Sequence, residues 1–165
     1  MKEQLVLGDL NLLESLHDSK ISTISIRENA LVLQFDDIVP STPELEEHQK
    51  SNGISRKLTV VYNFPFEPDF WTARAQLIYY KKKIFRPKVE SITLTEFLEL
   101  INNKITFPNK LIIEVLDQFF NNQWCVIEGI LYGKQADDKT FLFADVRLLF
   151  RCDKIEYDWE IARKQ

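Results

Sequence analysis

The sequence has few of the residues on which most recognised catalytic and ligand sites are built. Its 165 residues include two cysteines, two histidines and four glycines. Cys125 and Cys152 alone do not make a disulfide framework, and no Cys/His spacing resembles a zinc site. The shortage of glycine removes the usual phosphate-cradling loop. We therefore expect no catalytic set, no metal and no cofactor.

Long apolar runs and a basic charge balance are also missing. Nowhere do about 18 apolar residues run together, as a membrane-spanning helix requires, and the start of the chain opens no apolar signal region. The net charge of −4 and the pI near 5.3 lack the positive excess of nucleic-acid-binding proteins. Two unpaired thiols suit a reducing compartment. These observations predict a cytoplasmic protein without a membrane or nucleic-acid partner.

Aromatic residues and alternating patterns are what the chain has instead. It contains 12 Phe, five Tyr and three Trp, which suit the pleated faces of a sheet. Alternation of apolar and polar residues predicts the following strands: Lys20–Ile26, Ala30–Phe35, Lys57–Phe64, Ala73–Lys81, Lys110–Phe120, Gln123–Tyr132, Thr140–Phe150 and a last one in Asp153–Ile161. Pro87 restricts a further irregular strand at Ile84–Ser91 to an edge or a bulge.

One helix is predicted at Leu94–Asn102, where Thr93 and Glu96 have the spacing of a capping box. The length fits a single domain, residues 1–165. Together the elements predict an α+β fold that is mainly β. We expect a twisted antiparallel sheet that forms a sandwich or a half-barrel, with the helix packed on it.

A proline- and serine-rich stretch at about residues 36–56 predicts a mobile connection, since unstructured loops of this length tend to be functional or disordered. It carries carboxylates that predict an acidic face for a basic protein partner: Asp36, Asp37, Glu44, Glu46 and Glu47.

Aromatic residues also lie in a proline-punctuated connection further along the chain. Phe70 and Trp71 are candidate anchors for a partner protein. The alternative interpretation is that these aromatics plug an open end of the sheet.

Charged residues on the strong strands allow three interpretations. Glu128 shares a strand face with Trp124 and Ile130, and Glu114 and Arg147 lie on the flanking strands. If these faces point inward, the charges must pair, as Glu128 with Arg147, or line a ligand cavity formed with Glu114. Alternatively, the same faces form the solvent side of the sheet.

The adjacent residues His17, Asp18 and Ser19 do not predict a catalytic triad, because triad members converge from separate elements of the fold. They indicate a turn before the first hairpin, in which His17 bonds a backbone group.

The segment Leu16–Ile21 with its hairpin, and the closing Phe150–Trp159 with Ile155-Glu156-Tyr157, resemble a group of small bacterial β-rich proteins of unknown function. Some proteins of this kind are similar to immunity proteins that neutralise toxins. The resemblance implies a fold style and carries over no catalytic residue. The leading hypothesis is a non-enzymatic protein-binding domain, with toxin immunity as one role. The alternative is a small-ligand-binding β domain, and a homo-oligomer joined through exposed sheet edges stays open.

Overall fold

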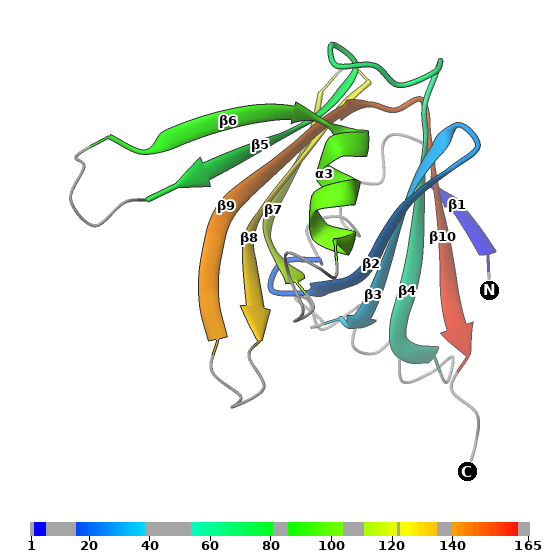
Figure 1. Cartoon of the computed structure of the whole chain (residues 1–165). Coiled ribbons are helices and arrows are strands. Elements are labelled where there is room, and N and C mark those ends of the chain that lie inside the picture. The colour runs from blue at the N-terminus through cyan, green and yellow to red at the C-terminus, as the bar shows by residue number, and fades with distance from the viewer. Residues whose placement is uncertain are drawn as a thin grey trace.

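The computed structural model describes residues 2–5, 16–38, 54–80, 86–103, 111–121, 123–134 and 140–161. These residues form one helix and a 10-stranded sheet (Figure 1). The elements are β1 (Lys2–Leu5), β2 (Lys20–Arg27), β3 (Ala30–Asp37), β4 (Ile54–Asn63), β5 (Ala73–Tyr79), β6 (Lys88–Thr93), α3 (Leu94–Asn102), β7 (Leu111–Asn121), β8 (Trp124–Lys134), β9 (Thr140–Arg151) and β10 (Lys154–Ile161).

The strands form a single sheet in the order β1-β10-β4-β3-β2-β7-β8-β9-β5-β6, and every neighbouring pair is antiparallel. The sheet does not close into a barrel, because β1 and β6 remain as its two edges. The prediction of a mainly β, antiparallel fold with a helix at Leu94–Asn102 is confirmed. Its finer form, a sandwich or a half-barrel, stays a prediction.

Several predicted boundaries need correction. The connection expected at about residues 36–56 begins later and ends earlier, since β3 continues to Asp37 and β4 starts at Ile54; its central residues, 39–53, lie outside the described part of the chain. The irregular strand near Pro87 is β6, which begins at Lys88 and forms an edge as expected. The strand at Lys2–Leu5 was not predicted from the sequence.

Two hairpin turns use unexpected residues in the left-handed region. Glu28 has a φ of 51° between β2 and β3, and Gln123 has a φ of 74° between β7 and β8. Asparagine is the usual residue for such angles, yet Asn29 has another role. Its side chain donates a hydrogen bond to the Phe64 carbonyl at 2.8 Å, and its own carbonyl accepts from the Phe64 N–H at 2.8 Å.

The sheet has two halves that meet at a short seam between β2 and β7. Only Lys20 with Glu114 and Ile21 with Ile113 form the paired register there. The turn before β2 lengthens the seam, because the Asp18 N–H donates to the Val115 carbonyl and the Val115 N–H donates to Ser19.

This turn at residues 16–19 confirms the turn interpretation of His17-Asp18-Ser19. The Ser19 N–H closes it on the Leu16 carbonyl at 3.1 Å, and Asp18 has a φ of 62°. The His17 Nδ1 lies 3.0 Å from the Asp18 carboxylate, and the predicted bond from His17 to a backbone group stays a prediction. Both side chains are exposed, which leaves this pair at the surface and outside any buried site.

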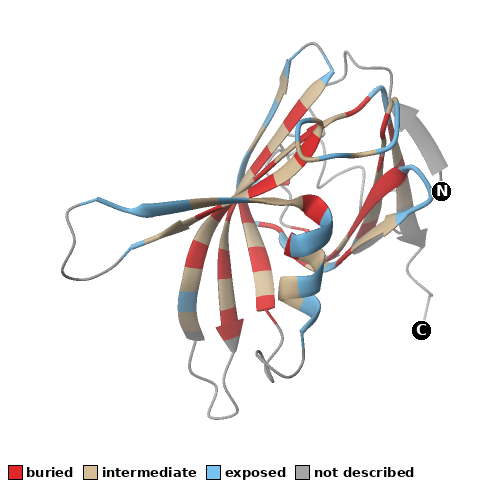
Figure 2. Ribbon diagram, turned by 45° about the horizontal axis from the view of Figure 1, so that its top comes forward, coloured by how far each residue is buried: buried red, intermediate tan, exposed pale blue. Residues whose placement is uncertain are grey.

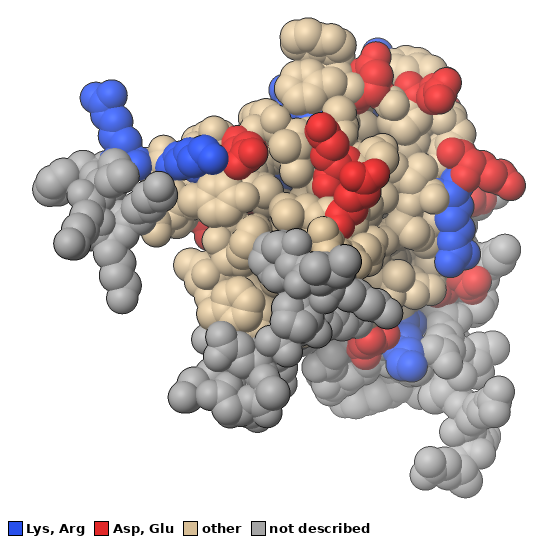
Figure 3. Space-filling view, in the orientation of Figure 1, with Lys and Arg blue, Asp and Glu red and all other residues tan. Residues whose placement is uncertain are grey.

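Helix α3 lies on the concave side of the sheet, between its two halves (Figure 1). Thr93 and Glu96 form the predicted capping box, and Leu94 and Phe97 are buried beneath the helix. The outward side of α3 carries Glu96 and Glu99, where Figure 3 shows acidic side chains gathered. The helix therefore covers the core and gives this side of the molecule a negative charge.

The two halves of the sheet pack on each other through aromatic rings on their inner faces. Phe150 of β9 meets Tyr62 of β4 edge-on at 5.1 Å between ring centroids, and Phe64 at 6.2 Å. Phe150 and Tyr62 are fully buried. Buried and half-buried residues alternate along β8, along most of β9 and along β7 as far as Val115 (Figure 2), so each strand gives one face to this core.

Both cysteine thiols lie in the same buried region and carry no disulfide. Burial raises the pKa of the Cys152 thiol to about 12 and that of Cys125 well above its usual value. Burial likewise raises the pKa of the Tyr62 and Tyr157 hydroxyls. These groups stay neutral at physiological pH and act as packing residues of the core.

The aromatic contact between the halves should make a large contribution to stability. We expect Phe150→Ala to lower the free energy of unfolding by about 3–5 kcal/mol, because it removes a fully buried ring and leaves a cavity. Urea unfolding followed by circular dichroism measures this change. Leu142→Ala is the control, since Leu142 on the same strand is 58% exposed and should change stability by less than about 0.5 kcal/mol. Equal losses in the two variants would contradict the role of Phe150.

The thiols should be unreactive while the protein is folded. A pKa of about 12 for Cys152 reduces the thiolate fraction at pH 8 by about a thousandfold relative to an ordinary cysteine. Ellman's reagent should therefore modify neither thiol in the native protein at pH 8 and both in denaturant. A thiol that reacts at the same rate in both conditions would contradict the burial described.

Candidate protein-binding surface

The loop between β4 and β5 holds its exposed aromatics on a tight hydrogen-bonded turn. Asp69 Oδ1 accepts from the Trp71 N–H, the Thr72 N–H and the Thr72 hydroxyl, each at 2.9 Å. The hydrogen bonds from Thr72 lower the pKa of the Asp69 carboxyl, so it is ionised at neutral pH. Phe70 meets Trp71 edge-on at 5.4 Å, and Trp71 is 72% exposed. The backbone of this turn is thus held by hydrogen bonds, and it carries a large aromatic side chain that is open to solvent.

Arg151 attaches this loop to the outer face of the sheet. Its backbone N–H donates to the Thr72 carbonyl at 2.8 Å, and its guanidinium lies 5.1 Å from the centre of the Phe66 ring. The same guanidinium donates to the Gln123 side chain at the β7–β8 turn. Arg151 therefore joins two loops that are distant in sequence and leaves Phe66 42% exposed.

The strand register extends this surface across the outer face of four strands. Phe119 of β7 lies opposite Val126 of β8, which lies opposite Leu149 of β9, which lies opposite Arg74 of β5. The Phe70 ring lies 5.9 Å from the Arg74 guanidinium, which connects the row to the loop. We call the resulting set the aromatic surface: Phe66, Phe70, Trp71, Arg74, Phe119, Trp124, Val126, Leu149 and Arg151.

A bulge in β7 explains why Phe119 belongs to the outer face. The pairing with β8 shifts between Val115 and Asp117, so the alternation of faces changes at Leu116. Before the bulge, Val115 is buried; after it, Phe119 is 49% exposed. A single extra residue thus moves a large aromatic side chain from the core face to the outer face.

The charged residues of the central strands lie on this same outer face, below the aromatic row. Glu128 and Arg147 are opposite each other in the register and form an ion pair at 2.6 Å. Their side chains are 33% and 42% exposed, respectively. The Tyr132 hydroxyl is bonded to Glu114, and burial together with this carboxylate raises the pKa of the phenol.

Two of the three interpretations of these charges are thereby decided. The cross-strand pair of Glu128 with Arg147 is confirmed, and it lies on the solvent side of the sheet. Glu114, Glu128 and Arg147 each have a partner on this open face, and a ligand cavity formed with Glu114 stays a prediction.

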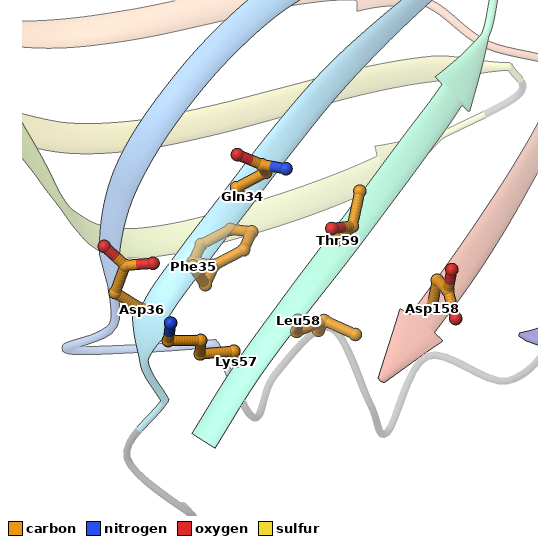
Figure 4. Close-up of a pocket in the computed structure, with 7 residues that line it drawn as sticks. All are labelled: Gln34, Phe35, Asp36, Lys57, Leu58, Thr59 and Asp158. Carbon is orange, nitrogen blue, oxygen red and sulfur yellow. The ribbon is translucent and has the colours of Figure 1, made fainter. Parts of the chain in front are cut away.

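The predicted acidic face is brought together only in part. Asp36 is exposed at a bulge of β3, whereas Glu44, Glu46 and Glu47 lie outside the described residues and so does the side chain of Asp37. Asp36 borders an open hollow of about 170 Å³ on the outer face of β3, β4 and β10 (Figure 4). Lys57 and Asp158 line the same hollow, so charges of both signs meet there.

The alternative interpretation had the aromatics of the β4–β5 connection plug an open end of the sheet. Phe66 and Trp71 do not do so, since both face solvent. Tyr62 and Phe64, which precede them, are buried and pack on Phe150. The predicted anchors Phe70 and Trp71 lie together and form part of the aromatic surface.

The side chains of the aromatic surface are of the types that bind other proteins. Rigid aromatic rings, a half-exposed aliphatic row and engaged arginines suit the binding of another protein. In the part of the chain that the structure describes, no group of three or more His, Cys, Asp or Glu residues could hold a metal ion. Among the same residues, no helix is long and apolar enough to cross a membrane.

Comparison of the chain with protein-family models, with curated proteins and with solved structures gives no match.

Of the nine residues of the aromatic surface, the sequence pointed only to Phe70 and Trp71 as binding residues. The other seven were not among the candidates: Phe66, Arg74, Phe119, Trp124, Val126, Leu149 and Arg151. The alternation along β8 and β9 was visible in the sequence and placed Val126 with Trp124. The missing information was the neighbour order β7-β8-β9-β5 and the bulge at Leu116, which depend on pairing between distant segments.

The Asp69 turn should control the mobility of the Trp71 loop. Asp69→Ala removes the acceptor of three hydrogen bonds, and we expect the Trp71 and Thr72 amides to exchange with solvent about 2- to 30-fold faster. Hydrogen exchange followed by NMR measures these two amides directly. Asp69→Asn is the matched control, because its side-chain oxygen still accepts and should preserve most of the protection. Unchanged exchange in Asp69→Ala would contradict a preorganised loop.

Proposed function

We propose that this chain is a non-enzymatic protein-binding domain that holds a basic protein partner on the aromatic surface. Trp71 supports the proposal most directly, because a 72% exposed tryptophan is costly to leave in water and the turn that carries it is already held by hydrogen bonds. The two thiols suit a reducing compartment, and we place this activity in the bacterial cytoplasm.

Charge supports a basic partner. The guanidinium groups of the surface are already engaged: Arg151 with Phe66, Arg74 with Phe70 and Glu128 with Arg147 in their ion pair. Carboxylates lie beside the rings: Glu67 and Asp69 belong to the loop that carries Phe66, Phe70 and Trp71. The chain as a whole has a net charge of −4, which would attract a cationic protein.

Toxin immunity is the narrower form of this proposal, as the resemblance of the Leu16–Ile21 segment and of the closing strand implies. An immunity protein acts by binding alone, so the absence of a catalytic set in the sequence agrees with it. A basic toxin, such as a nuclease, would match the charge of the surface.

Substitution of Trp71 tests the surface. We expect Trp71→Ala to weaken binding of the partner by about 30-fold, the effect of losing a hot-spot residue of about 2 kcal/mol. The partner would be captured from native lysate by the tagged full-length chain, identified by mass spectrometry, and then titrated in purified form by calorimetry.

Leu142→Ala is the matched control, because it removes a similarly exposed apolar side chain from the far end of β9. Binding should survive this change and should weaken as salt is raised. A partner held equally by wild type and Trp71→Ala, or a strongly acidic partner, would reject the proposal.

A further inference from the structure

The edge strand β6 leaves one side of its backbone open. Strand β6 pairs only with β5 among the described strands and ends the sheet (Figure 1). Val89 on this strand is 56% exposed. Edge strands with free backbone groups pair readily with a further strand unless something blocks them.

The capping box of α3 shows which residues of β6 point their backbone N–H and C=O groups away from β5. Thr93 donates its N–H to the Glu96 carboxylate at 2.7 Å and therefore does not give it to Arg74, its opposite on β5. Residues two apart on a strand point their backbone groups to the same side. Val89 and Ser91 thus present their N–H and C=O groups to the open side, where Pro87 supplies a carbonyl alone.

We propose that β6 is a docking edge for a second copy of this chain, paired antiparallel about Val89. In this register Val89 of each copy exchanges hydrogen bonds with Val89 of the other. Each Ser91 N–H donates to the Pro87 carbonyl opposite, so the missing N–H of proline costs little. This inference goes beyond the proposed function and does not depend on the aromatic surface.

The charged side chains of β6 favour a second copy of the chain as the partner, and they favour the pairing register centred on Val89. Lys88 and Glu90 lie on the inner side of β6 and form a pair at 3.2 Å within one strand. Centring on Val89 places Lys88 of each copy opposite Glu90 of the other, which adds reciprocal attraction across the edge. Centring on Glu90 would set two carboxylates against each other. The edge is therefore complementary to itself in one register.

Figure 3 shows the basic side chains at the outer end of the β5–β6 arm, beside an acidic one. Pairing through this arm would continue one sheet across both copies. Because the outer faces of the two sheets then lie on the same side, the dimer would present two aromatic surfaces in one direction.

Sedimentation velocity of the full-length chain over a wide concentration range tests the proposal. We expect a reversible dimer whose dissociation constant rises about tenfold in Lys88→Glu and in Glu90→Lys, because each sets like charges opposite each other. The double variant Lys88→Glu/Glu90→Lys restores opposite charges and should return to nearly the wild-type value.

The backbone is tested separately by Ser91→Pro, with Ser91→Ala as control. Proline removes the outward N–H and leaves the backbone bonds to β5 in place, so the variant should fold, as judged by circular dichroism, and remain monomeric. Both substitutions remove the bond that the Ser91 hydroxyl accepts from Gln76 of β5, so Ser91→Ala controls for that loss. Any of four results would overturn the proposal. The wild-type chain could be monomeric at every concentration, or the single charge variants could dimerise as the wild type does. The double variant could fail to recover the wild-type dissociation constant, or Ser91→Pro could unfold.

Discussion

The contact of Phe150 with Tyr62 and Phe64 is the packing interaction on which the rest of the molecule depends. Among the described residues, backbone bonds join the two halves of the sheet at the short seam of β2 with β7, at the turn that precedes it, and at the β9–β10 turn, where the Asp153 N–H donates to the Asn63 carbonyl. Hydrogen bonds at such a seam cannot fix how the halves face each other. The buried rings do so, because edge-on aromatic contacts at 5.1 and 6.2 Å close one end of the concave side. Helix α3 fills the space that remains between them.

Successive side chains of a strand point to opposite faces of the sheet. Once the inner faces are buried in this way, the residues that lie between the buried ones determine the chemistry of the outer face. Phe150 points inward, so its neighbours Leu149 and Arg151 must point outward. The outer row is consequently apolar at Leu149 and cationic at Arg151. The β4–β5 loop folds onto that row because Phe66 and Phe70 each lie over a guanidinium. The aromatic surface is thus a direct consequence of the core packing on the opposite side of the same strands.

The sequence predicted most of the strands and the helix, since alternation and the Thr93–Glu96 capping box are local signals. It did not predict the positive φ angles of Glu28 and Gln123, because long-range contacts impose them and take Asn29 for another purpose. Phe70 and Trp71 were identifiable as candidate anchors from their proline-rich surroundings. Phe119 and Arg151 were not, because their role depends on the bulge at Leu116 and on which strands are neighbours.

The cost of the outer face is the strongest argument that it is used. The hydrogen bonds of Asp69 hold the backbone of the turn that carries Trp71, while the indole itself stays in water. Polar substitutions at Phe66, Trp71 or Phe119 would not disturb the core, as all three lie outside it. Exposed apolar area also carries a risk of aggregation. Exposed aromatic residues of this kind are favourable when a complex buries them. The turn that carries Trp71 is then already ordered in the free protein, so binding costs less conformational entropy.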